Sequence, residues 1–235
     1  MRLRSLQRLN AARRKRVAAV ILTDLHADEE RVILEGDPIE EPFVALVERA
    51  FRSGRSIAFE TTVSNGFVNV YMPAPRIAII GAVHISQCLT QMARLAGFDV
   101  RVIDPRTAFA TRDRFPGVPL FADWPAEALV ADPLDRYTAL VALTHDPKID
   151  DFALVAALRT GCFYIGALGS RKTHAARMER LATNGLCADA LSIIHAPIGL
   201  DIGASNPAEI AVAILAQVIQ ALRSRLLSLS SDGPP

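Results

Sequence analysis

The chain has 235 residues, of which 51% are apolar and 22% are charged, and its formal net charge is +1. This composition excludes a wholly disordered chain, and the small net charge argues against a dedicated nucleic-acid-binding protein. No apolar run reaches the ~18 to 20 residues that cross a bilayer, so no membrane span is expected. Three cysteines without a C-x-x-C pair predict neither disulfides nor a zinc site, and they favour a cytoplasmic location.

The first 72 residues predict a small α+β domain. Residues 1–16 carry seven basic side chains and no acid. We expect a helix there with a solvated basic face and its leucines packed inward, and the alternative is a docking segment for an acidic partner. The other expected elements are strands over 17–23 and 31–34, a helix over 40–52, and a hairpin of 56–62 and 67–71. Asn65-Gly66 supplies the turn signal of that hairpin.

Pro73-Ala74-Pro75 marks a linker, because two prolines in three residues interrupt both helices and strand ladders. Beyond it, strands and helices alternate. The expected strands cover 76–82, 99–104, 138–144, 162–167 and 191–195, and the expected helices cover 84–96, 149–159, 171–184 and 207–227. This alternation predicts an α/β fold with a doubly wound parallel sheet behind the small α+β domain. The predicted domains are 1–72 and 73–227, followed by a disordered tail over 228–235.

Ligands of doubly wound sheets bind beyond the carboxyl ends of the strands. After the first strand of this sheet, Gly81 opens a dinucleotide-type turn, but Val83 stands where the second glycine of the motif belongs. His84 follows at a helix start, which attracts anions. After the second strand, Asp104 lies 23 residues beyond Gly81, near the spacing of a carboxylate that binds a ribose diol. Alternatively, Arg106 pairs with a phosphate. A third possibility is that these residues only form the turn that caps the strand end.

The third strand runs directly into Thr144, His145 and Asp146. A histidine flanked by carboxylates suits a proton shuttle or a ligand-binding residue. In the alternative, Asp146 or Asp150 caps the next helix. A metal site is not predicted, because no local pair of histidines or cysteines has the spacing of metal ligands.

The fourth strand end is rich in glycine and positive charge. Gly166 and Gly169 let a ligand approach the backbone, and Ser170 suits a helix N-cap. Arg171 and Lys172 oppose the helix dipole at this helix start. Their presence favours an anion, such as a phosphate group, bound at this turn.

The loop after the last strand places His195 and Asp201 among glycines and apolar residues, a composition typical of loops that line pockets. Asn206, Pro207 and Glu209 form a capping box for the final helix. We therefore expect Glu209 to hold the helix rather than to take part in chemistry.

Six motifs occur in a fixed order along the second part of the chain. They are GAVH at 81–84, IDPR at 103–106, LTHDPK at 143–148, GALGSR at 166–171, HAPIGLDIG at 195–203 and PAEIA at 207–211. Together they closely resemble the XdhC/CoxI family of xanthine dehydrogenase and carbon monoxide dehydrogenase maturation factors, over about residues 73–225. The resemblance implies a Rossmann-like domain behind a smaller N-terminal domain.

The resemblance also implies a function. Such a factor is a cytoplasmic chaperone, often a homodimer, that is not itself a catalyst. It binds the molybdenum cofactor, as molybdopterin or its dinucleotide form, and protects it during sulfuration by a cysteine desulfurase. It then delivers the cofactor to a molybdenum hydroxylase apoenzyme. The residues expected to hold the cofactor are Gly81, Val83, His84, Asp104, Arg106, Thr144, His145, Asp146, Gly166, Gly169, Ser170, Arg171, Lys172, His195 and Asp201.

Two other functions are compatible with the same residues. One is an NAD(P)-dependent oxidoreductase of unknown substrate, which the fold and Asp104 favour and Val83 disfavours. The other is a nucleotide-sensing regulatory protein. Binding of NADH or NADPH with turnover of a carbonyl substrate separates the oxidoreductase from the chaperone.

Overall fold

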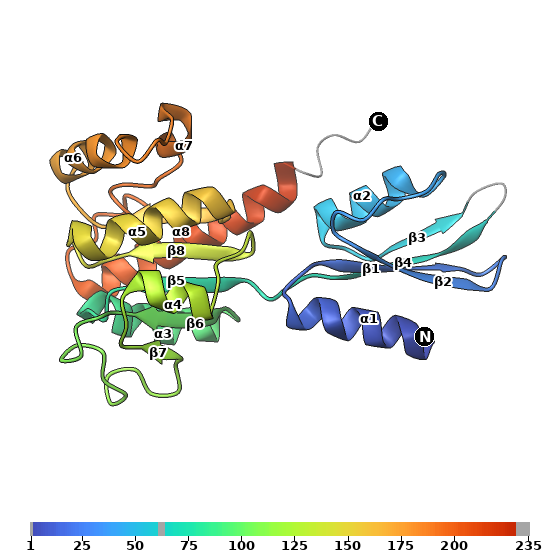
Figure 1. Ribbon diagram of the computed structural model, residues 1–235, viewed down its shortest axis with the longest axis horizontal. Coiled ribbons are helices and arrows are strands. Elements are labelled where there is room, and N and C mark those ends of the chain that lie inside the picture. The colour runs from blue at the N-terminus through green and yellow to red at the C-terminus, as the bar shows by residue number, and fades with distance from the viewer. Residues whose placement is uncertain (1, 61–63, 229–235) are drawn as a thin grey trace. The chain divides into compact units, whose positions relative to one another are not determined.

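The computed structural model describes residues 2–60 and 64–228 (Figure 1). The chain divides into two compact units, one of Met1–Pro73 with Arg223–Pro235 and one of Ala74–Leu222. The predicted disordered tail lies outside the described residues, apart from Ser228, at which the last helix ends. Across 2–60 and 64–228, no helix is both long and apolar enough to cross a membrane.

The first unit is a four-stranded antiparallel sheet with one helix on each face. Its strands are β1 (Ala19–Asp24), β2 (Glu29–Leu34), β3 (Ile57–Glu60) and β4 (Asn65–Tyr71), in the order β2-β1-β4-β3. Its helices are α1 (Leu3–Arg14) and α2 (Val44–Ser53). Because side chains alternate along a strand, β1 presents Ile21 to the side of α1 and Val20 to the side of α2. Both faces of β1 are therefore buried over Ala19–Leu22, and Figure 1 shows α1 and α2 on opposite faces of this sheet.

Two expectations for this unit are wrong. Leu9 of α1 is buried, but Leu3 and Leu6 are exposed. Successive helical residues are rotated by roughly 100°, so Leu3 lies about 120° around the helix from Leu9 and faces solvent. The hairpin of β3 and β4 is present, but Asn65 and Gly66 are paired residues inside β4 rather than its turn.

The second unit is a five-stranded parallel sheet with helices on both faces. The strands are β5 (Arg76–Ile80), β6 (Asp99–Ile103), β7 (Leu120–Phe121), β8 (Thr138–Ala142) and β9 (Tyr164–Ala167), in the order β7-β6-β5-β8-β9. The helices are α3 (His84–Leu95), α4 (Pro125–Ala131), α5 (Pro147–Thr160), α6 (Arg171–Ala182), α7 (Ala188–Ser192) and α8 (Pro207–Ser228). This order is that of a Rossmann sheet, and it confirms the predicted α/β class.

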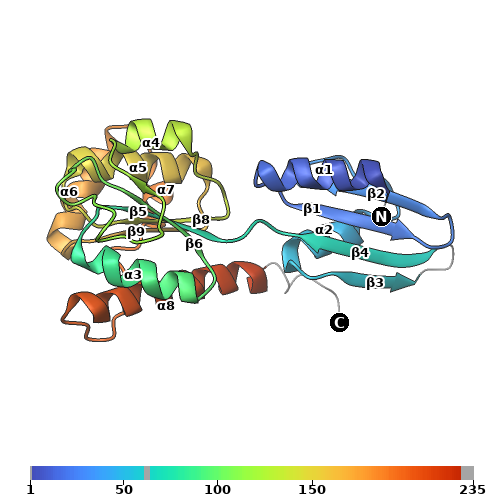
Figure 2. The same ribbon diagram turned by 90° about the horizontal axis from the view of Figure 1, so that it is seen from below.

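The two faces of this sheet bury separate apolar clusters. Ile77 and Ile79 of β5 pack with residues of α3 and α8, whereas Ala78 and Ile80 pack with residues of α4, α5, α6 and α7. Figure 2 shows α3 and α8 on one side of the sheet and α4 and α5 on the other. Every residue of β5 and β8 is buried, which is why both strands are apolar after their first residues, Arg76 and Thr138.

The strand expected over 191–195 is wrong. Leu191 lies in α7, and pairing with β9 is limited to one parallel bridge between His195 and Gly166. A short apolar run does not distinguish a strand from a helical turn. Two elements, β7 and α4, fall in the proline-containing segment between β6 and β8 and were not predicted.

Gly66 provides a test of the first unit. An added Cβ at Gly66 would overlap the carbonyl oxygen of Thr23 on β1. We expect Gly66→Ala to lower the free energy of unfolding by about 2 kcal/mol, because backbone atoms of a central strand cannot move aside cheaply. Urea-induced unfolding measures this change. Asn69→Ala, at an exposed position of the same strand, is the control, and equal midpoints for the two variants would refute the close approach.

Candidate functional site

The candidate site lies at the carboxyl ends of the parallel strands. β5, β6, β8 and β9 end at Ile80, Ile103, Ala142 and Ala167, and the predicted polar sequences follow each of them. The chain builds β6 and β7 on one side of β5, and then β8 and β9 on the other side. The strand order therefore reverses between β5 and β8, and that is where doubly wound sheets hold their ligands.

Gly81 and Thr144 meet at this switch point. Gly81 has φ +111°, and a Cβ added to it would lie 2.9 Å from Thr144 Cγ2. Only glycine fits there, because the backbone conformation and the space both exclude a side chain. The Ser86 hydroxyl donates to the Gly81 carbonyl and accepts from the Val83 amide. Val83 thus precedes α3 as its half-buried N-cap residue, and His84 is the exposed first residue of that helix.

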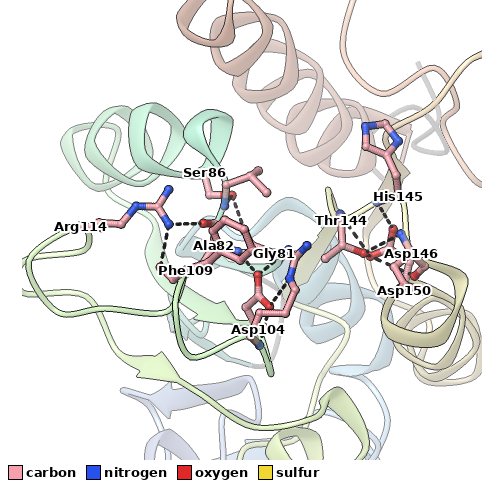
Figure 3. A network of polar contacts seen from close by, with 12 residues as sticks. Gly81, Ala82, Ser86, Asp104, Phe109, Arg114, Thr144, His145, Asp146 and Asp150 are labelled. Atoms are coloured by element: carbon pink, nitrogen blue, oxygen red, sulfur yellow. Dashed lines mark hydrogen bonds and ion pairs between the residues drawn. The ribbon is translucent and has the colours of Figure 1, made fainter.

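Asp104 is fully buried, and its carboxylate is saturated (Figure 3). It accepts hydrogen bonds from the Ala82 amide at 2.7 Å and the Arg106 amide at 2.9 Å. It also accepts from Arg106 Nε at 2.9 Å and Arg106 Nη2 at 2.7 Å. Burial alone raises the pKa of Asp104, but hydrogen bonds from Arg106 and Ala82 outweigh it and leave the pKa below its ordinary value. Two carboxylate oxygens have about four acceptor positions, and all are used.

This arrangement corrects two expectations. Asp104 has no acceptor position left for a ribose diol, and Arg106 is paired with Asp104 rather than held ready for a phosphate. The Arg106 guanidinium also lies over the ring of Phe109, 4.7 Å from its centroid. Sequence spacing placed both residues at the correct strand end, but it did not show that they satisfy each other.

Arg114 is a residue that the sequence reasoning missed. Its Nη1 donates to the carbonyl oxygens of Ala82 and Phe109, each at 2.8 Å, and its Nη2 donates to Gln87 Oε1 at 3.2 Å. It thereby ties the long connection between β6 and β7 to the turn between β5 and α3 (Figure 3). No motif marks it, because two of its partners, the Ala82 carbonyl and the Gln87 side chain, are far away in the sequence.

Asp150, on the first turn of α5, organises the end of β8 (Figure 3). Its side chain is 1% exposed and accepts from Thr144 Oγ1 at 2.7 Å, the His145 amide at 3.1 Å and the Thr144 amide at 3.4 Å. Burial raises the pKa of Asp150 to about 6, against these hydrogen bonds and the charge of Arg177, which lower it. Asp146 is the N-cap of α5 and accepts from the Lys148 amide at 3.0 Å, so the capping alternative for Asp146 is confirmed.

His145 sits in an uncommon conformation. Its φ of +61° is in the left-handed region, which a residue with a Cβ rarely adopts, and the hydrogen bond to Asp150 holds it there. Its side chain is exposed at the strand end. Burial of part of the ring lowers the pKa of His145, and the positive charge of Arg177 lowers it further.

The turn between β9 and α6 ends in the N-cap residue that the sequence predicts, Ser170. Ser170 Oγ accepts from the Thr173 amide at 3.2 Å, and Gly169 has φ +144°. Arg171 and Lys172 are exposed on the first turn of α6. The only described residues of α6 that are buried are Arg177 and Leu181, and the sequence reasoning missed Arg177. The available signal was its spacing four residues before Leu181, which places both on one helix face.

Three predicted residues lie apart from the switch point. Gly166 is inside β9, where an added Cβ would lie 2.6 Å from Ile198 Cγ1, so this glycine serves packing and not the approach of a ligand. His195 pairs with β9, and its ring stacks on Tyr164 with centroids 4.9 Å apart. Asp201 is exposed in the loop before α8 and has no hydrogen bond among the described residues.

The contacts therefore connect a subset of the predicted residues. Gly81 touches Thr144, and Asp104 joins Ala82 to Arg106. The turn after β8 also acts electrostatically on the turn after β6. The charges of Asp146 and Asp150 add to that of Asp104 in raising the pKa of Arg106. Within the described part of the chain, no group of three or more His, Cys, Asp or Glu side chains is arranged to hold a metal ion. The predicted capping box is confirmed, since Asn206 Oδ1 accepts from the Glu209 amide and Glu209 accepts from the Ser205 amide.

Asp150 gives a testable pH dependence. Its pKa is about 6 in the folded protein against an ordinary value of 3.8, so its protonation favours folding. This contribution is complete below about pH 4 and is lost as the pH rises through 6. We expect the free energy of unfolding of the wild type, relative to Asp150→Asn, to fall by up to about 3 kcal/mol between pH 4 and pH 7. Urea unfolding of both proteins measures this difference, and a difference that stays constant with pH would contradict the assignment.

Comparisons with known proteins agree with the fold. A family model described as the XdhC Rossmann domain matches residues 77–218. A probable xanthine dehydrogenase subunit of Bacillus subtilis (strain 168) is 33% identical over 158 residues, covering 67% of this chain and 46% of that protein. The molybdenum cofactor insertion chaperone PaoD of Escherichia coli (strain K12) is 30% identical over 205 residues, covering 86% of this chain and 56% of that protein.

A crystal structure described as a xanthine dehydrogenase from Bacillus halodurans has a similar fold. Its TM-score with this chain is 0.69 at 25% identity, covering 98% of this chain and 70% of that one. This chain spans about half the length of the two curated relatives above. The family model matches well over half of the chain, in the region that carries the six motifs. The chain therefore belongs to the XdhC family, and residues 77–218 form its Rossmann domain.

Proposed function

We propose that this chain is a maturation factor that binds the molybdenum cofactor, protects it during sulfuration by a cysteine desulfurase, and delivers it to a molybdenum hydroxylase of the xanthine or carbon monoxide dehydrogenase type. The similarity to an insertion chaperone over 86% of this chain supports the cofactor and the class of recipient. In this proposal the chain is an accessory protein that works in the cytoplasm as a homodimer. The chemistry of hydroxylation belongs to the enzyme that receives the cofactor.

One observation carries the proposal: a buried guanidinium with unpartnered nitrogen atoms lies beside the strand ends. Arg177 is 2% exposed, and its Nε and Nη1 have no hydrogen-bond partner among the described residues. The cofactor carries a phosphate, or a pyrophosphate in its dinucleotide form, and a polar pterin. The start of α6 lies beside this guanidinium, because Arg177 Nη2 is 3.7 Å from the point where a Cβ of Gly169 would lie. The residues present therefore fit a ligand with an anionic group.

The pterin would meet the side chains at the end of β8. The imidazole of His145 is exposed there and has no hydrogen-bond partner among the described residues. Asp146 and Thr144 lie in the same turn. These groups offer both donors and acceptors, which suits the heteroatoms of a pterin edge.

An NAD(P)-dependent oxidoreductase is less well supported. The carboxylate in the ribose-binding position, Asp104, is saturated by Ala82 and Arg106. Val83 also occupies the place of the second glycine of the dinucleotide motif. NADH is therefore a suitable comparison ligand in the binding experiment.

The test is binding of the fluorescent oxidised derivative of molybdopterin to the purified protein, followed by fluorescence and by co-elution in gel filtration. We expect binding by the wild type, and we expect His145→Ala to weaken it about five- to tenfold, the loss of one or two hydrogen bonds. Because the His145 side chain is exposed, the substitution should change the free energy of unfolding by less than about 0.5 kcal/mol.

His26→Ala is the matched control, since His26 is an exposed histidine of the first unit and should leave binding unchanged. A wild-type protein that fails to bind the derivative, or that binds NADH more tightly, would refute the proposed function. Large destabilisation of His145→Ala with normal binding would show instead that His145 is a structural residue.

A further inference from the structure

Arg177 is a buried cation that forms no ion pair with the residues that the structure describes. It lies on α6 and is 2% exposed. Nη2 donates to the carbonyl oxygen of Leu168 at 2.9 Å, whereas Nε and Nη1 are buried without a hydrogen-bond partner in the described part of the chain. Arginine stays protonated in proteins, and a buried charge without a partner is unfavourable. A residue of this kind needs an explanation beyond packing.

The carboxylates near Arg177 are already engaged. Asp150 is held by donors from Thr144 and His145. Asp151 accepts from Arg180 Nε at 2.9 Å and Arg180 Nη2 at 3.2 Å. Among the described residues Arg177 forms no ion pair, although both aspartates lie close enough to act on its pKa. Its positive charge is thus without an ion-pair partner in the described part of the chain.

The guanidinium of Arg177 lies against the turn that opens α6. Nη2 is 3.7 Å from the point where a side chain of Gly169 would begin, and Ser170 caps the helix at the next position. Amide groups at a helix start favour negative charge. The Thr173 side chain lies on the same side of Gly169, with its Cγ2 3.2 Å from that point.

The charge of Arg177 acts on two histidines, His145 and His174. Burial lowers the pKa of His145 and of His174, and the positive charge of Arg177 lowers each further. His174 Nδ1 is itself buried without a partner. Uncharged imidazoles offer N–H donors without adding a second charge.

We propose that Arg177 binds a phosphate group at the turn between β9 and α6, with the amides at the start of α6 and His174 as further donors. The identity of the molecule that carries this phosphate, molybdopterin or its dinucleotide form, rests on the proposed function. We assign anion binding at this turn to Arg177 rather than to Arg171 and Lys172, for which the sequence predicted it. Those two side chains are exposed, and ion pairs at an exposed surface are weak.

The experiment compares the thermal midpoints of wild type and Arg177→Met with and without inorganic phosphate, at constant ionic strength in sodium chloride. Without phosphate, we expect Arg177→Met to have a midpoint equal to or above that of the wild type, because methionine removes the unpartnered charge. With phosphate, the wild-type midpoint should rise and that of Arg177→Met should not. In titration calorimetry the variant should bind phosphate at least about tenfold more weakly.

The double variant Arg171→Ala/Lys172→Ala is the control on the same helix. It loses two exposed cations and should keep most of the phosphate response. Arg177→Lys is a second variant, for the case that Arg177→Met does not fold. It should fold and bind phosphate more weakly than the wild type. A wild type without a phosphate response, or a response that survives in Arg177→Met and is lost in the double variant, would overturn the proposal.

The source of the phosphate is tested with pyrophosphate and with the fluorescent oxidised derivative of molybdopterin. We expect both to bind the wild type more tightly than Arg177→Met. Equal binding of the derivative to both proteins overturns the role of Arg177 and leaves the proposed function standing. An Arg177-dependent response to phosphate without any binding of the derivative supports the phosphate site and refutes the proposed function.

Discussion

The close approach of Gly81 to Thr144 is the constraint on which the rest of the site depends. β5 and β8 are neighbours in the sheet, but the chain leaves them toward helices on opposite faces. The two turns that follow fit side by side only because Gly81 has no side chain, since a Cβ would lie 2.9 Å from Thr144 Cγ2 and 3.3 Å from the Thr144 amide nitrogen. The crevice of a doubly wound sheet opens at this point, so one glycine decides whether it can form.

Two buried carboxylates then hold the two sides of the crevice. Asp104 ties the turn after β5 to the turn after β6, and Asp150 ties the turn after β8 to α5. The oxygen atoms of each carboxylate accept hydrogen bonds from backbone amides and neighbouring side chains of this chain. Both are therefore positioning residues. Among the described residues, what remains for a ligand is the exposed imidazole of His145 and the unpartnered nitrogen atoms of Arg177.

Much of the fold was predictable because its signals are local. The buried strands of the second unit are continuous apolar runs, and the caps at Asp146, Ser170 and Glu209 use side chains within three residues of their partners. The errors occur where a local signal competes with long-range pairing. Asn65 and Gly66 resemble a turn, but pairing with β3 and β1 places them inside β4. Gly166 resembles a ligand-binding glycine, but Tyr164 and Ile198 fill the space beside it.

The sequence by itself determined the alternation of strands and helices, the ends at which polar residues gather, and the family to which the chain belongs. Only the tertiary structure decided which of those polar groups are left to bind a ligand and which are paired within the chain. Arg106, Arg171 and Arg177 are equally basic in the sequence, yet one is paired with a buried aspartate, one faces solvent, and one is buried with two nitrogen atoms unpartnered. The physical reason is that pairing and desolvation arise from contacts between distant segments, and residue type and spacing do not specify those contacts.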